Sequence, residues 1–296
     1  LLTGDDAKTA ASPTAMARFP GSDAGVVVGS GNGSVVSLDS NGKELWRYTL
    51  GSAVRDLAGG EIGADKKAVV VIGGNDGALH VVGRDGKLLW KKELSFYRRE
   101  PHVNLVRIAD LDGDGSGEVV AGGNNWKFFV WDSTGKERWN YETVHPSRSA
   151  AIADLDGDGT REIVAGTEYT WASILEHDGK LRSKVRFQSP ICHSIDTGLF
   201  RKEKGVGILF GAGDGHLYQA DSHGEVVFRF DTGDEVTEVR GIDLDGNGID
   251  EMVAASGNGY LYAFTGEGKP LWRRPVAGAI SDLASITVDG VTALAA

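Results

Sequence analysis

The stretch Asp110-Leu-Asp-Gly-Asp-Gly-Ser-Gly-Glu118 decides the fold of this chain, because it returns twice in nearly the same form. The second copy is Asp154-Leu-Asp-Gly-Asp-Gly-Thr-Arg-Glu162, and the third is Asp243-Leu-Asp-Gly-Asn-Gly-Ile-Asp-Glu251. Each copy has oxygen-bearing side chains at positions one, three, five and nine. A glycine at position six permits the sharp turn that folds these side chains around one hard cation. The three segments therefore predict calcium loops.

An EF-hand is excluded, because its bidentate glutamate belongs at loop position twelve, where this chain has Ala121, Ala165 and Ala254. The flanking residues are apolar runs typical of strands, so we expect nine-residue loops that join two strands. Up to three Ca²⁺ ions are expected. The predicted metal residues at positions one, three, five, seven and nine are Asp110, Asp112, Asp114, Ser116, Glu118, Asp154, Asp156, Asp158, Thr160, Glu162, Asp243, Asp245, Asn247, Ile249 and Glu251.

The spacing of the loops indicates a repeat. The first two start 44 residues apart and the third starts 89 residues later, which is two periods. A second pattern, Gly-Lys-x-x-Trp, has the same period. Its tryptophans are Trp46, Trp90, Trp139 and Trp272, and weaker copies of the pattern begin at Gly179 and Gly224. Six repeat units are visible.

Between these markers the chain alternates short apolar runs with glycine-rich turns, such as Gly31-Asn-Gly33 and Gly257-Asn-Gly259. Four short strands in a unit of roughly 40 to 50 residues are typical of a β-propeller blade. We therefore predict an all-β chain in which residues 1–296 form a single β-propeller domain, with seven blades of mainly four antiparallel strands. Ser281–Thr287 and Val291–Ala296 are expected to start the last blade, and the N-terminal residues up to Ala11 to close it. The alternative is a piece of a longer chain.

The composition fits a secreted, periplasmic or cell-surface protein. The chain has 43 glycines, two methionines and a single cysteine, Cys192. No apolar run approaches the roughly 18 residues of a membrane span. The net charge is −11, and three calcium ions would reduce it to −5. Without a basic stripe to neutralise phosphates, nucleic acid is not expected as a partner.

The acidic loops resemble the calcium-binding FG-GAP or VCBS-type propeller repeat. The Gly-Lys-x-x-Trp strands are similar to the tryptophan-docking repeats of quinoprotein-like propellers (PQQ-like repeats). This resemblance implies a propeller fold but leaves the function open, because such propellers include adhesion modules, scaffolds and polysaccharide lyases. It also offers pyrroloquinoline quinone as a cofactor. We expect none, because those enzymes carry a disulfide of adjacent cysteines and Cys192 has no such neighbour. The repeated tryptophans are interpreted as structural wedges between blades.

The loops opposite the calcium side carry residues that break the repeat, and departures from a repeat are where function is best sought. Trp126 and Trp171 are predicted to stand where other units have glycine, and Asn104 and Arg148 to occupy equivalent places near the central channel. The candidate ligand-binding residues are Arg98, Arg99, Asn104, Trp126, Tyr169 and Trp171. The candidate catalytic residues are His102, His145, His193, Tyr97 and Arg148. The remaining histidines, which are interpreted as structural, are His80, His177, His216 and His223.

Aromatic rings stack on sugar faces, and arginine clamps carboxylates through two parallel hydrogen bonds. These residues in blades three to five therefore predict a face that binds acidic polysaccharide. One alternative is a polysaccharide lyase, in which arginine neutralises a uronate carboxylate while histidine or tyrosine moves the proton. Another is a protein scaffold or adhesion module, because Trp, Tyr and Arg also dominate protein hot spots.

Overall fold

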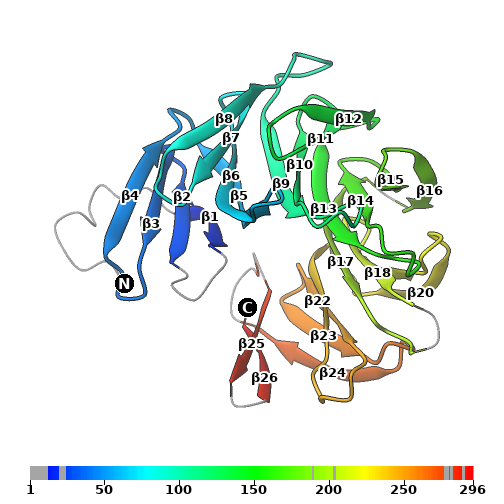
Figure 1. The fold of residues 1–296 in the computed structure, drawn as a ribbon. Coiled ribbons are helices and arrows are strands. Elements are labelled where there is room, and N and C mark those ends of the chain that lie inside the picture. The colour runs from blue at the N-terminus through cyan, green and yellow to red at the C-terminus, as the bar shows by residue number, and fades with distance from the viewer. Residues whose placement is uncertain are drawn as a thin grey trace. The chain divides into compact units, whose positions relative to one another are not determined.

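The computed structural model describes residues 13–19, 25–188, 190–202, 205–276, 280, 283–288 and 291–295. These residues form strands, turns and irregular loops, and no helix occurs among them. Six antiparallel sheets have four strands each, and a seventh has two (Figure 1). We number these sheets 1 to 7 in chain order. The prediction of an all-β, propeller-like fold is thus confirmed.

The first three sheets lie in one compact unit, which contains Leu1–Asp110 and Asp114–Glu142. Sheet 1 has β1 (Pro13–Arg18), β2 (Val26–Ser30), β3 (Ser34–Leu38) and β4 (Glu44–Thr49). Sheet 2 has β5 (Val54–Ile62), β6 (Lys67–Gly74), β7 (Ala78–Gly83) and β8 (Leu88–Glu93). Sheet 3 has β9 (Val103–Ala109), β10 (Glu118–Gly123), β11 (Lys127–Trp131) and β12 (Glu137–Glu142).

The other sheets lie in a second unit, which contains Leu111–Gly113 and Thr143–Ala296. Sheet 4 has β13 (Ser147–Ala153), β14 (Glu162–Thr167), β15 (Trp171–Leu175) and β16 (Leu181–Arg186). Sheet 5 has β17 (Cys192–Gly198), β18 (Gly207–Ala212), β19 (His216–Ala220) and β20 (Val226–Asp231). Sheet 6 has β21 (Val236–Ile242), β22 (Glu251–Ser256), β23 (Tyr260–Phe264) and β24 (Pro270–Pro275). Sheet 7 has β25 (Ala284–Val288) and β26 (Val291–Ala295).

Every four-stranded sheet is a meander, in which each strand pairs with the next one along the chain. Within the first unit β1 packs beside β5 and β5 beside β9, and within the second β13 packs beside β17 and β17 beside β21. The sheets of a unit therefore follow one another as propeller blades do. Apolar side chains fill the space between neighbouring sheets: Val27 and Val70 share one core in the first unit, and Val164 and Phe210 share one in the second.

Burial follows this packing. The second strand of sheets 3, 4 and 6 is buried along its whole length, whereas the residues of the fourth strands are mostly exposed or half-buried. The fourth strand is the edge of its sheet, and each carries a β-bulge, a device that twists an exposed edge. The bulge residues are Leu45, Leu89, Arg138, Arg182, Val227 and Leu271. This equivalence becomes important at the acidic loops.

Two of the predicted tryptophan wedges are confirmed. The indole Nε1 of Trp46 donates a hydrogen bond of 2.9 Å to the backbone oxygen of Arg84 in the next sheet, and Trp90 donates one of 3.1 Å to Ser133. Gly86 must remain small beneath Trp46, because a Cβ there would lie 2.8 Å from the indole Cγ and its φ is +79°. In sheets 1 and 2 the Gly-Lys-x-x-Trp pattern therefore joins one sheet to the next.

The predicted start of the last blade is confirmed in part. Ala284–Val288 and Val291–Ala295 pair as an antiparallel hairpin, with bounds close to those expected from the sequence. The N-terminal residues predicted to pair with them, up to Ala11, lie outside the described residues. Closure of a seven-bladed ring stays a prediction.

Candidate metal centres and ligand-binding residues

The three acidic loops occupy the same place in their sheets. Each joins the first strand to the second, in sheets 3, 4 and 6, as the sequence predicts. Glutamate at position nine starts the second strand in all three, so the loops are strand-to-strand turns and not helical EF-hands.

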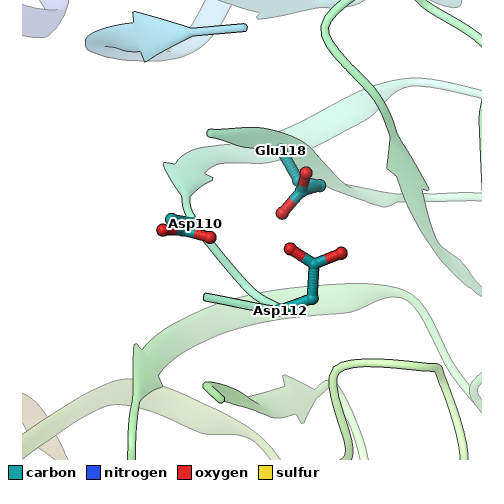
Figure 2. A group of neighbouring side chains, drawn as sticks. All are labelled: Asp110, Asp112 and Glu118. Atoms are coloured by element: carbon teal, nitrogen blue, oxygen red, sulfur yellow. The ribbon is translucent and has the colours of Figure 1, made fainter. Parts of the chain in front are cut away.

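Three carboxylates converge in each loop, from positions one, three and nine. The groups are Asp110, Asp112 and Glu118; Asp154, Asp156 and Glu162; and Asp243, Asp245 and Glu251. One ligand oxygen from each member lies within 4.8 Å of the others, and Figure 2 shows the first group. An all-oxygen set of this kind suits a hard divalent cation such as Ca²⁺.

The aspartate at position one organises the loop backbone. Asp243 Oδ1 accepts hydrogen bonds from the N–H groups of Gly246 and Asn247, and its Oδ2 accepts one from Gly248. Asp154 makes the same three contacts in sheet 4. The turn is therefore held in shape by its own backbone hydrogen bonds.

The glutamate at position nine is the buried member. Glu118, Glu162 and Glu251 are only 2%, 0% and 6% exposed. Burial raises the pKa of Glu162 and Glu251, because desolvation disfavours the charged carboxylate. A buried carboxylate needs a positive partner, so the residues present fit a bound cation.

In sheets 3 and 4 an arginine supplies part of that positive charge. Arg138 lies 3.1 Å from Glu118, and Arg182 lies 3.0 Å from Glu162. Both arginines are the bulge residues of their fourth strands. Arg182 also contacts Asp156 at 2.9 Å and Glu176 at 2.7 Å. These arginines are ion-pair partners of the loop carboxylates, and the sequence analysis did not predict them.

Sheet 6 differs at this position, because its bulge residue is Leu271. Glu251 Oε2 accepts a hydrogen bond of 2.8 Å from the Leu244 N–H. Its other oxygen makes no hydrogen bond or ion pair with any residue that the structure describes. The carboxylates of this loop therefore have no cationic side chain among them.

Positions five and seven lie outside the three carboxylate groups. The position-five oxygen accepts a 2.7 Å hydrogen bond from the backbone N–H of position seven in every loop: Asp114 from Ser116, Asp158 from Thr160 and Asn247 from Ile249. Their service as metal ligands stays a prediction.

The basic residues that replace acidic loops in sheets 2 and 5 contact neighbouring sheets. Lys66 Nζ donates to the backbone oxygen of Gly115, in the acidic loop of sheet 3. Arg201 Nε donates to the backbone oxygen of Gly266 at 3.3 Å, in the last turn of sheet 6. Each basic residue thus binds the loops of the sheet that follows its own.

The predicted ligand-binding residues of the first unit form an aromatic and cationic cluster. The guanidinium of Arg98 lies 5.3 Å from the ring centroid of Tyr97 and 5.7 Å from that of Trp126. The Lys127 ammonium lies 5.1 Å from the Tyr97 ring, whose hydroxyl donates to Glu142 at 2.6 Å. Arg98 and Trp126 have φ values of +61° and +65°. Such left-handed backbone is costly for residues other than glycine, and it is concentrated at functional sites.

Trp126 stands where four other sheets have glycine, as predicted. The equivalent residues before the third strand are Gly33, Gly77, Gly215 and Gly259, all with positive φ. The prediction for sheet 4 was wrong by one residue. Trp171 is the first residue of β15, and Thr170 occupies the turn position that glycine takes elsewhere. The turn between the second and third strands has three residues in both sheets, one fewer than the prediction for Trp171 required.

The remaining candidates of the first unit lie nearby in sequence and are paired. His102 Nε2 lies 3.3 Å from Glu100, and Arg99 lies in the exposed entering loop. Asn104 is the second residue of β9 and the bulge residue of that strand. The equivalent bulge residue of sheet 4 is Arg148, so the predicted equivalence of these two positions is confirmed.

In the second unit the candidates form another aromatic group. The His145 and Tyr169 rings stack with centroids 4.4 Å apart and planes 6° apart. Trp171 meets the Tyr169 ring edge-on at 4.7 Å, and the Lys184 ammonium lies 4.8 Å from the Trp171 ring. Flat rings beside a cation suit a sugar or a carboxylate.

Arg148 and His193 are bulge residues of neighbouring first strands. The Arg148 side chain is exposed and makes no hydrogen bond or ion pair within the described part of the chain. His193 Nε2 lies 3.2 Å from Glu235. Burial is the main cause that lowers the pKa of His193, and Arg148 lowers it further, while Glu235 opposes both. The two groups of candidates thus belong to different units, and a single face built from both stays a prediction.

The four histidines interpreted as structural lie in strands or in third-to-fourth-strand turns. His80 is 4% exposed and joins Tyr48 and Asp76 through hydrogen bonds of 2.8 Å. His216 contacts Asp214, and Tyr218 donates to the same carboxylate at 2.6 Å. Cys192 is buried, and desolvation raises the pKa of its thiol to about 12, which makes it unreactive in the folded chain.

A cavity of about 940 Å³ opens beside the acidic loop of sheet 6. Its walls include Asp245, Glu251 and Trp272, together with Arg201 and Lys202 from the turn between β17 and β18. The sequence analysis missed this cavity, because it depends on how two sheets pack. Trp272, predicted as a wedge, lines the cavity.

No helix among the described residues is long and apolar enough to cross a membrane. In a comparison with known families, the family described as outer membrane protein assembly factor BamB aligns with residues 6–169. A search of curated proteins found no match.

Proposed function

Since this chain belongs to the family of PQQ-like repeat propellers described as outer membrane protein assembly factor BamB, we propose that it is a calcium-stabilised, non-catalytic binding propeller. The finer parts of this proposal are the seven blades, FG-GAP or VCBS-type calcium binding, and a place outside the cytoplasm. The observation that carries it is the convergence of three carboxylates in three equivalent loops, each with a buried glutamate.

Calcium offsets the repulsion among the three carboxylates and the desolvation of the glutamate. Isothermal titration with CaCl₂ is expected to show saturable binding, and the melting temperature should rise with the calcium concentration. The control is Asp243→Asn combined with Asp154→Asn and Asp110→Asn, which leaves polar caps in the loops. Unchanged titration heats in this triple variant would rule the loops out as the sites.

The end opposite the acidic loops is proposed to bind acidic polysaccharide. The support comes from the first unit, where Arg98 lies over Tyr97 and Trp126, and where two non-glycine residues hold strained backbone. In the second unit His145, Tyr169 and Trp171 offer a further aromatic surface. Rings of this kind stack on sugars, and free guanidinium groups such as Arg148 pair with carboxylates.

Trp126→Gly tests this part of the proposal. Glycine tolerates the positive φ of residue 126, so the variant is expected to be more stable by about 1 kcal/mol in chemical unfolding. Its affinity for uronate-containing polysaccharide should nonetheless fall, as measured on a glycan array. If the variant gains stability and still binds the polysaccharide as tightly as wild type, Trp126 does not contact the ligand.

Lyase activity is the alternative on the same residues, and it requires a free base and a free acid. The Tyr97 hydroxyl donates to Glu142 and His145 stacks on Tyr169, arrangements that favour binding over proton transfer. Ultraviolet absorbance of an unsaturated uronate product decides the point. A rise in wild type that is absent in Arg148→Ala would replace the binding proposal by the lyase.

A protein scaffold is the second candidate, and the family match favours it. That family is described as outer membrane protein assembly factor BamB, and an assembly factor would need a surface that contacts other proteins. Phe96, 72% exposed in the loop that enters sheet 3, and Val144, 39% exposed in the loop that enters sheet 4, suit such contacts. Failure of every glycan to bind, with retained calcium binding, would shift the proposal to this function.

A further inference from the structure

The acidic loop of sheet 6 is the one whose carboxylates have no arginine partner in the part of the chain that the structure describes. In sheets 3 and 4 the fourth-strand bulge residue is arginine, and it reaches the buried glutamate. In sheets 1, 2 and 5, which have no acidic loop, the equivalent residue is Leu45, Leu89 or Val227. Arginine at this bulge therefore accompanies an acidic loop, and Leu271 in sheet 6 is the exception.

The consequence is an unpaired oxygen that faces open space. Glu251 is 94% buried, since its exposed fraction is 6%, and one of its oxygens has no partner among the described residues. The same residue lines the cavity of about 940 Å³, beside Asp245 and Asn247. The partnerless oxygen borders the cavity and is open to solvent, so it can coordinate a hard cation that enters there together with Asp245.

The cavity also has cationic walls. Arg201, Lys202 and Lys269 line it, and Lys202 makes no hydrogen bond or ion pair with other described residues. With Asp243, Asp245, Glu251 and Glu267, the carboxylates outnumber these cations by one. A bound divalent ion makes the local charge positive, and a cavity of this size then attracts an anion.

The remaining walls are apolar. Leu271 is 48% exposed, and Trp272 is half-buried at the edge of the cavity. A ring beside basic groups and an accessible hard cation is the combination that recognises a carboxylated sugar: the carboxylate coordinates the ion and pairs with basic groups, while the sugar face packs on the indole.

We propose that the cavity of sheet 6 is a calcium-dependent binding site for a uronate sugar, in which Asp243, Asp245 and Glu251 hold the ion while Arg201, Lys202 and Trp272 contact the ligand. This inference rests on the calcium binding of the proposed function, and it is independent of the aromatic residues at the opposite end of the sheets. The other two loops are closed by their arginines and serve structure alone.

The test is titration of a uronate disaccharide, in Ca²⁺ and in EDTA, into the whole chain. Wild type is expected to bind in Ca²⁺ and not in EDTA. Lys202→Gln and Trp272→Ala should each lower the affinity for the disaccharide by about tenfold. This is a typical loss for one charge-assisted hydrogen bond or one stacked ring. Their calcium affinity should stay unchanged. Trp272→Phe, which keeps a ring, should restore most of the affinity.

The controls separate this inference from the proposed function. Leu271→Arg places the arginine of sheets 3 and 4 in sheet 6, and it should abolish disaccharide binding, because the guanidinium then takes the space of the ligand beside Glu251. The contrary result is that Trp272→Ala and Lys202→Gln bind the disaccharide as wild type does, while Trp171→Ala loses that binding. This result would place the sugar on the aromatic residues at the end of the sheets opposite the acidic loops. It would overturn this inference and leave the proposed function intact. Absence of any calcium binding would overturn both proposals.

Discussion

The acidic loops of sheets 4 and 6 have similar sequences, but a cationic side chain contacts the carboxylates of the first and an apolar residue takes its place in the second. In sheet 4, Arg182 lies between Asp156, Glu162 and Glu176, at 2.7 to 3.0 Å from each. In sheet 6, Leu271 holds the equivalent bulge, and the loop opens into a cavity. One loop thus has a cationic side chain among its carboxylates, and the other has none among the described residues. On the proposal above, the repeated motif serves structure in one sheet and binding in another, and the residue that distinguishes the two lies on the fourth strand.

The largest expected effect tests the internal counterion. Arg182→Leu copies sheet 6 into sheet 4 and leaves Glu162, which is fully buried, without its partner. Breaking a buried ion pair on one side costs about 3 kcal/mol of unfolding free energy, to be measured by urea unfolding in EDTA. Calcium should restore the greater part of this loss, because the ion then supplies the missing charge.

Arg273→Leu is the matched control, because Arg273 lies on the fourth strand of sheet 6, over the Tyr260 ring and away from the acidic groups. Its loss should cost less than about 1 kcal/mol, as is usual for an exposed cation–π contact. Equal losses for Arg182→Leu and Arg273→Leu would show that Arg182 does not act as a counterion.

The next effect compares the two glutamates in calcium. A ligand at about 100 times its dissociation constant stabilises the folded state by about 2.7 kcal/mol. Glu251→Gln should remove the larger share of this calcium-dependent stabilisation and Glu162→Gln a smaller one, because Arg182 supplies part of the positive charge beside Glu162. The measurement is the shift of the melting temperature between EDTA and saturating Ca²⁺. If Glu251→Gln and Glu162→Gln lose the same fraction of the calcium-dependent shift in melting temperature, the proposed difference between the loops of sheets 4 and 6 is wrong.

Sequence reasoning reached the loops and strands because both depend on local pattern. Asp110, Asp154 and Asp243 lie between first and second strands, because the loop glycines permit positive φ and the aspartate can accept hydrogen bonds from the N–H groups that follow it. The one-residue error at Trp171 came from matching one tryptophan to another, whereas counting from Glu118 and Glu162 places Trp126 and Thr170 at the same turn position. Arg182 carried a readable signal, an arginine two residues after Gly-Lys in an acidic unit, but its role depends on a bulge that only the pairing reveals. The cavity beside Trp272 is set by two packed sheets and has no local pattern.

The smallest expected effect uses Cys192 as a reporter between the two loops. Cys192 lies in sheet 5, whose neighbours are sheets 4 and 6, and burial raises its thiol pKa to about 12. Labelling by a thiol reagent therefore requires opening of this region, so the rate reports its local stability. Calcium should slow labelling in wild type, and Glu251→Gln should lose more of this protection than Glu162→Gln. If calcium does not change the labelling rate of Cys192, the ion stabilises its own loop and not the adjacent sheet.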